Sequence, residues 1–568
     1  MLVEKSTGAL LFATRRLGCV WAFSILVAGV SCSGGGATTG SGGVAGSVGA
    51  IGSGGILAAG GSGGLGGSLV GTGAGGASDV DGASSGEAGV GTEGTTRAAW
   101  ARTVVPPGTG SELSSLAVDR SGNIYVSGNL WGPGTADFGN GVTATANYDR
   151  YNGLLVKYDG AGTPQWARSS ILGDIGPLAI DSAGNVWALV SLPDVASGTI
   201  DFGNGVTVTK SDTLFDTVLV KYDWTGTAQW AQTVTDDSGN AGSDGGRASL
   251  TLDGSGNVYV AGGLAVSGTS DAGTGVTNSG SPAYAFLVKY NSSGVSQWKR
   301  TVTATSANGY APFSGFGGIA VDLEGSVYGS CGVGRGVYDF GNGLSVAGSN
   351  SVRVKYNASG IAQWTRTGAS GVLALDSAGG VYLGGSVGGG AVDFGNGVSA
   401  QGTLNKGAFL CLECGPIFPL LVKYDSSGTA QWARTVATGG ASAYFSSIAV
   451  DSTGSVYAAG TAYSPGPYDF GNGATIVADA QSENYSLLVK YSASGVAEWA
   501  RSSKHAGSAS SDDEFNAVAV DSTNSLYVAG IVAGPGDLDY GDNVVVTGLM
   551  VIPLTVGPGW NALLVKYR

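Results

Sequence analysis

Few side chains in this 568-residue sequence are suited to catalysis or metal binding. It contains one histidine, five cysteines and two methionines. His505 is followed by Asp512, Asp513 and Glu514, and an imidazole near carboxylates can perform general acid–base catalysis. A solvated charged loop explains the same residues. No P-loop or H-E-x-x-H phrase occurs. We therefore assign no catalytic residue, and the composition favours a non-catalytic protein while leaving an enzyme open.

Carboxylate and amide oxygens recur in patterns that could bind calcium. The phrase DFGNG stands at 137–141, 201–205, 339–343, 393–397 and 469–473, and a separate acidic stretch covers 236–244. Neither has the D-x-[DN]-x-[DN]-G spacing of a dedicated calcium loop. The Asn-Gly pair is also typical of a tight hairpin tip, with the Phe packing against the sheet. We expect no cofactor and keep calcium as the alternative.

The amino-terminal residues have the pattern of an export signal. Lys5, Arg15 and Arg16 precede an apolar run at 17–30, which is shorter than the ~20 residues that a membrane-spanning helix needs. Gly29-Val30-Ser31-Cys32 resembles a lipobox, whose cysteine becomes acylated. We expect export, with Cys32 as the lipidation site and outer-membrane lipid as its partner. Ordinary cleavage and release from the cell is the alternative.

Cys411 and Cys414 form a C-x-x-C pair. With Cys331 as the only other cysteine of the repeat region, they do not complete a four-ligand zinc site. Because exported proteins meet oxidising conditions, we expect a short-loop disulfide between Cys411 and Cys414.

Residues 33–96 contain 26 glycines among 64 residues, without periodicity. Such a segment cannot bury enough apolar surface to offset its ordering entropy, so we expect a disordered tether. The formal net charge of the whole chain is −14, which argues against nucleic acid as a partner.

The sequence after residue 97 consists of seven repeats. A tryptophan in QWAR-like phrases recurs every 64 to 68 residues, and LVKY-like and LAVD-like phrases recur with it. Each repeat predicts four short strands, A to D. Five-residue turns join A to B and C to D, and they begin with Asp, Asn or Ser and carry Gly at the fourth place. Twelve of thirteen such turns have this Gly, and Asn524 is the exception. The repeated tryptophans, lysines and aspartates are Trp100, Trp166, Trp230, Trp298, Trp364, Trp432, Trp499, Lys157, Lys221, Lys289, Lys355, Lys423, Lys490, Lys566, Asp119, Asp181, Asp253, Asp322, Asp376, Asp451 and Asp521.

These phrases, LAVDSxGNVYVAG and LVKYDxxGTxQWAR, resemble the bacterial β-propeller repeat (SBBP) of exported surface proteins and lipoproteins. The resemblance implies an all-β, seven-bladed β-propeller of four-stranded antiparallel blades. The repeat phase leaves a strand D at 98–104 and a strand C at 563–567 without partners. We therefore expect the N-terminal strand to close blade 7. The expected organisation is a signal peptide at 1–32, a tether at 33–96 and the propeller at 97–568.

Strand alternation places the short A–B and C–D turns on one face and the long B–C and D–A connections on the other. Binding residues concentrate on loops held by a rigid scaffold. We predict a monomeric extracytoplasmic binding or adhesion protein that recognises a glycan, small molecule or protein on this loop face. The alternatives are a propeller lyase or hydrolase acting on polysaccharide or a small molecule, and a structural cell-surface protein. The aromatic residues that we expect on this face are Trp131, Tyr148, Tyr151, Tyr463 and Tyr468.

Overall fold

The computed structural model describes part of the chain: residues 96–104, 109–193, 198–210, 216–236, 248–263, 283–306, 314–348, 351–402, 417–439, 442–463, 466–478, 484–505, 511–548 and 559–568. The described residues form strands and turns and contain no helix. A membrane-spanning helix is accordingly not found among them. The predicted all-β fold is confirmed.

In the described part of the chain, seven four-stranded antiparallel units are the main elements. Six take their strands from one sequence repeat, and the seventh takes its fourth strand from the N-terminal end. A hairpin of repeat 4 extends the third unit into a six-stranded sheet. We number them by repeat. Sheet 1 comprises β2 (Gly110–Val118), β3 (Ile124–Trp131), β6 (Asn152–Tyr158) and β7 (Pro164–Leu172). Sheet 2 comprises β8 (Asp174–Ile180), β9 (Val186–Leu192), β12 (Asp216–Tyr222) and β13 (Ala228–Asp236). Sheet 3 comprises β14 (Ser249–Leu252), β15 (Val258–Gly263), β16 (Ala283–Tyr290) and β17 (Ser296–Ser306).

The later repeats follow the same plan. Sheet 4 comprises β18 (Ser314–Val321), β19 (Val327–Val333), β22 (Ser351–Tyr356) and β23 (Ala362–Gly368). Sheet 5 comprises β24 (Gly371–Leu375), β25 (Val381–Gly388), β28 (Ile417–Tyr424) and β29 (Ala430–Arg434). Sheet 6 comprises β31 (Ala443–Val450), β32 (Val456–Ala462), β35 (Tyr485–Tyr491) and β36 (Ala497–Arg501). Sheet 7 comprises β38 (Asp512–Val520), β39 (Leu526–Ala533), β42 (Trp560–Tyr567) and β1 (Ala98–Thr103).

Small hairpins connect the second and third strands of six of these sheets. Within the described residues they are β4 (Gly134–Asp137) with β5 (Thr143–Ala146), β10 (Gly198–Asp201) with β11 (Thr207–Lys210), β20 (Gly336–Asp339) with β21 (Ser345–Ala347), β26 (Ala391–Gly395) with β27 (Val398–Gln401), β33 (Gly466–Asp469) with β34 (Thr475–Ala478), and β40 (Asp537–Asp539) with β41 (Val545–Thr547). β20 pairs with β17, β33 with β30 (Thr438–Gly439) and β40 with β37 (Lys504–His505). These hairpins therefore link neighbouring repeats at their outer edges.

The five-residue turns form as predicted because their first side chain caps them. In sheet 2, the Asp181 carboxylate accepts hydrogen bonds from the backbone N–H groups of Ala183 and Asn185, at 3.0 and 2.9 Å. Gly184 has a φ of 81°, and the exceptional Asn524 has a φ of 63°. Left-handed φ is tolerated best by Gly and then by Asn, which explains the sequence choice at this place.

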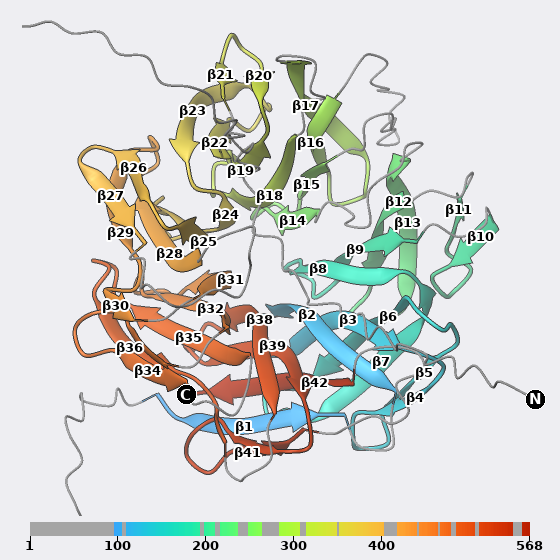
Figure 1. The fold of residues 1–568 in the computed structure, drawn as a ribbon. Coiled ribbons are helices and arrows are strands. Elements are labelled where there is room, and N and C mark those ends of the chain that lie inside the picture. Colours follow the sequence, from blue (N-terminus) through green and yellow to red (C-terminus); the bar gives the residue numbers. More distant parts are fainter. Residues whose placement is uncertain are drawn as a thin grey trace, which may run out of the picture. The chain divides into compact units, whose positions relative to one another are not determined.

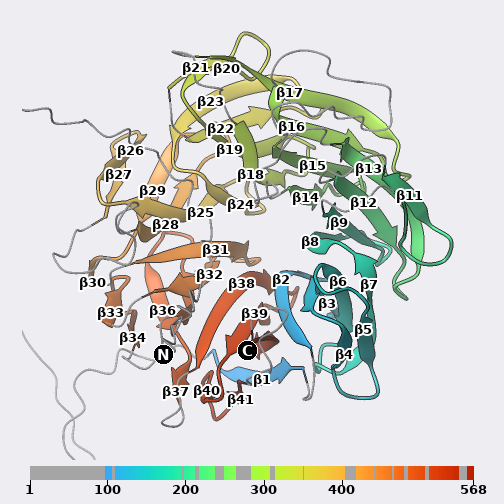
Figure 2. The same ribbon diagram turned by 45° about the vertical axis from the view of Figure 1, so that its right-hand side comes forward.

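The first strands of the sheets lie side by side in a closed order. β2 contacts β8, and the series continues through β14, β18, β24 and β31 to β38, which returns to β2. Figures 1 and 2 show the sheets arranged around a common centre with these strands innermost. Serine hydroxyls connect the inner strands, because Ser115 Oγ accepts the Leu178 N–H at 3.2 Å and Ser447 Oγ accepts the Val518 N–H at 3.1 Å.

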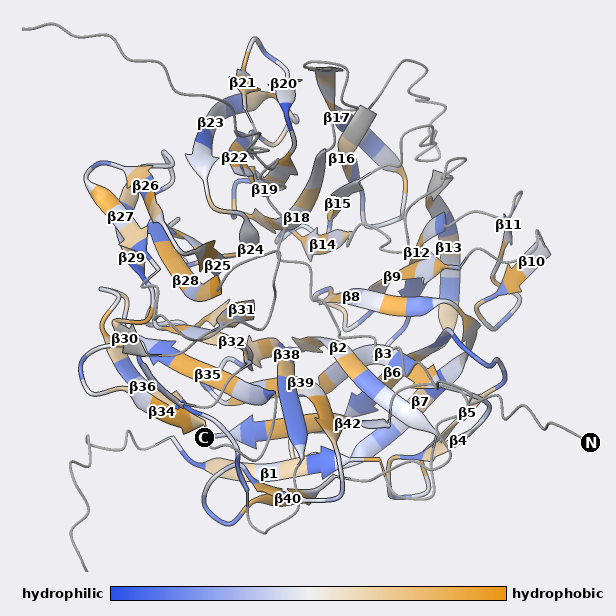
Figure 3. Cartoon of the chain, viewed as in Figure 1, coloured by the Kyte–Doolittle hydropathy of each residue, from blue (hydrophilic) through white to orange (hydrophobic). Residues whose placement is uncertain are grey.

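The core lies between the sheets. The middle strands are buried on both faces: every residue of β6 and of β32 is buried. Apolar stretches along β28 and β35 are visible in Figure 3. Burial of both faces explains why LLVKY-like phrases read as nearly continuous apolar runs rather than as alternating ones.

The two ends of the repeat region pair in sheet 7. β1 is antiparallel to β42, with Trp100 opposite Lys566 and Thr103 opposite Leu563. Arg97 and Arg568 exchange both backbone hydrogen bonds, at 2.5 and 2.7 Å. The expected pairing of the N-terminal strand with the last strand is observed. β1 thus supplies the fourth strand of sheet 7. Without it, the sheet would end in an unpaired edge.

Candidate binding site at the loop face

One position of the inner strand departs from the repeat symmetry. It lies seven residues before the repeated Asp, near the start of the first strand, at the end of the sheets that carries the long connections (the loop face). Acids occupy it in sheets 1, 2 and 7, which are neighbours in the ring: Glu112, Asp174 and Glu514. The other four repeats have Gly246, Gly315, Ala369 and Tyr444. We call Glu112, Asp174 and Glu514 the acid arc.

The carboxyl groups of the acid arc influence one another. Burial, followed by the charge of Glu112, raises the pKa of Asp174 to about 7. Burial also raises the pKa of Glu514 to about 7, with further contributions from the charges of Asp513, Glu112 and Asp512. Glu112 therefore acts on carboxyl groups on both sides of it. At neutral pH the arc holds both protons and negative charge.

Amide side chains support two of these acids. Asn129 lies opposite Glu112 in the β2–β3 ladder, and its Nδ2 donates to Glu112 Oε1 at 3.4 Å. Asn484 Nδ2 donates to Glu514 Oε1 at 2.9 Å. The second contact comes from sheet 6, so four consecutive sheets contribute side chains to this region.

Three buried polar atoms near the arc lack a hydrogen-bond partner. They are Asn129 Oδ1, Trp131 Nε1 and Asp174 Oδ1. Asn129 and Trp131 lie on the same face of β3, since strand residues two apart share a face. Ser127, on this face too, bonds to Gly176 O of sheet 2 at 2.6 Å, so the face is directed at the sheet that carries Asp174. Buried polar groups are nearly always hydrogen-bonded, so this group is suited to a polar ligand.

Four of the five predicted aromatic residues lie around this region. Tyr151 O accepts the N–H of Gly173, next to Asp174, and Tyr148 in the same connection is 40% exposed. Trp131 ends β3, as described above. Tyr463 stacks on Tyr444, the sheet 6 counterpart of the acids, with ring centroids 5.7 Å apart.

The fifth aromatic residue has a different environment. Tyr468 is only 1% exposed, and its hydroxyl donates to Ser442 O at 3.3 Å. It lies on β33, where the side chain packs inward beneath the hairpin. In this conformation Tyr468 is part of the core rather than of a ligand surface.

His505 and Asp513 make contacts with backbone and hydroxyl groups. The His505 ring bonds to the backbone of Ser511, at 3.0 Å to its carbonyl oxygen. Asp513 points elsewhere: it is buried, and its Oδ1 accepts the Ser486 N–H at 3.0 Å and the Ser503 hydroxyl at 2.8 Å. Burial raises the pKa of Asp513. Only Glu514 of this stretch belongs to the acid arc.

The repeated residues have structural contacts. In repeat 5, Asp376 accepts a hydrogen bond from the Tyr382 hydroxyl at 3.0 Å and lies 3.2 Å from the Lys423 ammonium group. Trp432 packs edge-on against Tyr382, and Arg434 donates to Gly495 O of the next repeat at 2.6 Å. These contacts recur around the ring and attach each sheet to the next.

The DFGNG phrases form hairpin tips. Asp201 Oδ1 accepts the Gly203 N–H at 2.8 Å, and Asn204 Nδ2 donates to Ala228 O at 3.1 Å. Phe202 is buried beneath the tip, as the sequence predicts. Within the described ranges, no three His, Cys, Asp or Glu side chains are grouped as they would be around a metal ion.

Several predicted sites lie outside the described residues. These are the lipidation site Cys32, the disulfide pair Cys411 and Cys414, and most of the acidic stretch 236–244. Cys331 is described; it is buried with a free thiol, and burial raises its pKa to about 12.

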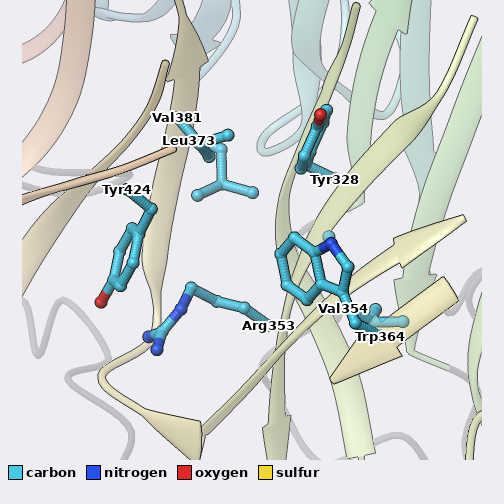
Figure 4. A pocket seen from close by; sticks show the side chains of 8 residues that line it. Tyr328, Arg353, Val354, Trp364, Leu373, Val381 and Tyr424 are labelled. Carbon is cyan, nitrogen blue, oxygen red and sulfur yellow. The ribbon is translucent and has the colours of Figure 1, made fainter. Parts of the chain in front are cut away.

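A small cavity lies between sheets 4 and 5. Arg353 reaches it from β22, and Figure 4 shows its guanidinium group beside Tyr424, with Trp364 and Leu373 also lining the space. The guanidinium carbon is 4.2 Å from the Tyr424 ring centre. The cavity volume is about 10 Å³, enough for one water molecule. It is therefore not a site for an organic ligand.

Comparison with known proteins identifies distant structural neighbours. No protein-family description and no curated protein matches the sequence. Virginiamycin B lyase from Staphylococcus aureus is 9% identical with a TM-score of 0.35, covering 82% of this chain and 98% of its own. The Dos1 propeller is 9% identical with a TM-score of 0.34, covering 83% and 95%. A polysaccharide lyase, ulvan lyase, is 9% identical with a TM-score of 0.38, covering 75% and 93%. At these scores, function must be argued from this chain's own residues.

Sequence reasoning missed two members of the acid arc. Glu112 and Asp174 are isolated acids in otherwise ordinary strands. Aligning the seven repeats on the Asp of their LAVD-like phrases would have shown these two acids. Glu112 and Asp174 each stand seven residues before that Asp, as Glu514 does.

Proposed function

We propose that this protein is an exported, surface-anchored β-propeller of seven blades that binds a glycan, small molecule or protein at its loop face. The observation that carries the proposal is the broken symmetry of the inner strands. A residue needed only for folding would recur in every repeat, whereas the acid arc occupies three adjacent sheets. The unpaired atoms of Asn129 and Trp131 lie beside it.

The seven-bladed arrangement is supported by the cyclic contacts of the seven inner strands and by the pairing of β1 with β42. In this arrangement the stability of the closed ring depends on the N-terminal strand β1. Deleting 97–105 should destabilise the protein far more than deleting 33–96, in thermal unfolding of the two truncated chains. Equal melting temperatures would contradict closure by this strand.

Binding is tested with a glycan and metabolite array probed with the full chain and with the variant Glu112→Gln/Asp174→Asn. We expect a ligand that the intact protein retains and the variant loses. Glu324→Gln is the matched control, because Glu324 is an exposed acid in an A–B turn at the opposite face. Equal binding by both variants would remove the acid arc from the proposal.

Anchoring through Cys32 is tested by the Cys32→Ser variant. One acyl chain binds a membrane only marginally, whereas two or more anchor stably. The variant should therefore move completely from the membrane fraction to the soluble one. Unchanged partitioning would contradict lipidation and favour release of the chain.

The proposed Cys411–Cys414 disulfide is tested by mass spectrometry of the exported protein before and after reduction. A gain of two hydrogens on reduction supports the disulfide. Two thiols that react with alkylating reagent before reduction would contradict it.

A second candidate function is a lyase or hydrolase acting on polysaccharide. It is favoured by the carboxyl groups of Asp174 and Glu514, whose pKa of about 7 suits a general acid at neutral pH. The assay is release of new chain ends from a polysaccharide panel, with Glu514→Gln as the variant. Turnover that Glu514→Gln abolishes would establish catalysis, and binding without turnover would favour the first proposal.

A further inference from the structure

The acid arc has the chemistry of a site for a positively charged group. Three carboxyl groups from three neighbouring sheets lie near the start of the inner strands, and Glu112 interacts electrostatically with the other two. Bringing like charges together in a partly buried place is unfavourable, and a cation between them relieves the repulsion. The repeat symmetry did not require these acids, because Gly, Ala and Tyr hold the same position elsewhere.

A second observation concerns the neutral groups of the site. Asn129 is only 5% exposed, yet its Oδ1 accepts no hydrogen bond. Its Nδ2 is directed at Glu112, so the amide lies against the arc. An ammonium group carries several N–H donors and could serve the amide oxygen and the carboxylates together. Trp131 Nε1, also unpaired, is a donor and would suit an oxygen of the same ligand.

Aromatic residues belong to the middle sheet of the arc and to the sheet beside it. Trp131, Tyr148 and Tyr151 lie on the side of sheet 1, and the stacked Tyr444 and Tyr463 lie on the side of sheet 6. Aromatic faces attract ammonium groups through their quadrupoles, and they also cover the apolar parts of a ligand. We infer that the acid arc binds an ammonium group of the ligand, with Asn129 Oδ1 as an additional acceptor. This inference rests on the proposed binding function at the loop face and names its ligand class: an amine that also carries an oxygen acceptor.

Protons should leave the site when the ammonium group binds. The charges of Asp512 and Asp513 on its own strand and of Glu112 on β2 act on Glu514, and the amide of Asn484 bonds to it. Asp174 faces Glu112. His505 bonds to Ser511, next to Asp512. Protonation of the Asp174 and Glu514 carboxyl groups weakens cation binding, so affinity should increase from pH 5.5 to pH 8.

The test compares two probes of the same length. Binding of 1,5-diaminopentane and of 1,5-pentanediol to the full chain is measured by calorimetry at pH 8. At this pH both amino groups of the diamine are charged. We expect the diamine to bind at least ~10-fold more tightly than the diol. At pH 7, where the carboxyl groups of Asp174 and Glu514 are partly protonated, its binding heat should also depend on the buffer because protons are released. Equal affinity for the two probes would overturn the inference.

Variants locate the binding on the protein. Glu112→Gln and Glu514→Gln should each weaken diamine binding by at least ~10-fold, while Glu324→Gln should leave it unchanged. Because a neutral amide removes repulsion without removing volume, the first two variants should not lower the melting temperature, which is measured alongside. Diamine binding that both variants retain would overturn the inference. Calcium is titrated as a competitor, and displacement of the diamine by micromolar calcium would assign the arc to a metal ion instead.

The outcomes separate this inference from the proposed function. If the array yields a neutral ligand that Glu112→Gln/Asp174→Asn loses, while the diamine does not bind, the binding function holds and the ammonium site is wrong. If neither array ligands nor the diamine bind, the proposed function fails, and the ammonium site fails with it.

Discussion

At the scale of single residues, most polar side chains in this protein serve the repeat, and the exceptions carry the information about function. Asp376, Lys423 and Trp432 have counterparts in the other repeats and make similar contacts. Glu112, Asp174 and Glu514 occupy a position at which four repeats carry no acid. Arg353 is a further exception, since it stands where the other six repeats have leucine: Leu155, Leu219, Leu287, Leu421, Leu488 and Leu564.

Arg353→Leu should stabilise the protein. The Arg353 side chain is 3% exposed, its Nε has no partner, and burial lowers the pKa of its guanidinium group. Replacing a buried charge with an apolar residue of suitable shape often stabilises a protein by ~1–4 kcal/mol. Denaturant unfolding measures the change. Arg353→Ala is the control, because it removes the charge but leaves a larger cavity. Loss of stability in Arg353→Leu would show that the bonds of the guanidinium group to Thr367 O and Ala369 O outweigh its burial.

The acid arc should make stability depend on pH. The folded-state pKa of Asp174 and of Glu514 is about 7, whereas unfolded Asp and Glu have a pKa near ~4. These groups thus favour the folded state fully below pH ~4, and that contribution is lost as pH rises through about 7. The melting temperature should fall by several degrees between pH 5 and pH 8.

Glu112→Gln is the variant that checks this cause. Removing the Glu112 charge lowers the pKa of both neighbours, so the fall in melting temperature between pH 5 and pH 8 should become smaller. Asp253, Asp376 and Asp521 have a lowered pKa and lose their contribution only in stronger acid, outside this range. A melting curve that is flat in the intact protein would contradict the prediction.

At the scale of strands and turns, one turn type has two separate tasks. The glycine at its fourth place supplies left-handed φ in both A–B and C–D turns. In the C–D turns it also leaves room for the tryptophan of the preceding repeat. A Cβ on Gly294 would lie 2.2 Å from the Trp230 ring, whereas a Cβ on Gly122, in an A–B turn, would meet nothing within 4 Å.

The pair Gly294→Ala and Gly122→Ala separates these tasks. Both glycines have a φ near 78°, so both variants should lose ~1–2 kcal/mol for left-handed backbone. Gly294→Ala should lose ~1–3 kcal/mol more, because the methyl group must displace a packed indole ring. Unfolding in denaturant measures both free energies. Equal losses would mean that the Trp230 contact between repeats has little energetic value.

The elements were largely predictable from sequence, and the site was only partly so. Turn chemistry such as Asp181-Ser-Ala-Gly-Asn is local, so the repeated phrases predicted the strands and their order. The proximity of Glu112, Asp174 and Glu514 depends on how the inner strands of different repeats align in the ring. No short stretch of sequence predicts that alignment. Tyr468 shows the converse limit: its aromatic ring in a long connection suggested a surface residue, but the fold of its hairpin buries it.

At the scale of the whole repeat region, pairing of the chain ends holds the ring closed. β1 contributes the outer strand of sheet 7, and Arg102 donates to Gly162 O of repeat 1 at 2.8 Å. Arg97 forms an ion pair with Asp542 at 3.9 Å, and Ala98 N donates to the same carboxylate at 3.0 Å. Asp542 replaces the Asn found in the other DFGNG tips, and this change suits a strand that begins without a connecting turn.

A cross-link between the ends should stabilise the closed ring. Arg97 and Arg568 exchange both backbone hydrogen bonds, and such pairs have Cα atoms ~5.5 Å apart, within the range of a disulfide. The variant Arg97→Cys/Arg568→Cys should form this bond under oxidising conditions and gain at least ~2 kcal/mol in stability. Thermal unfolding with and without reductant measures the gain, and Arg97→Ser/Arg568→Ser is the control. Failure to form the disulfide would contradict the pairing of the ends.

The direction of β1 has a mechanical consequence. β1 begins beside Arg568, at the face of the short turns, and runs toward the loop face, where the acid arc lies. If the chain is held at Cys32 and a ligand pulls on the loop face, the force enters at Thr96 and acts along β1. The hydrogen bonds between β1 and β42 are then loaded in shear. All of them resist the force at the same time, instead of opening one after another. A protein held in this way would turn its loop face outward and carry tension through the strand pair that closes the ring.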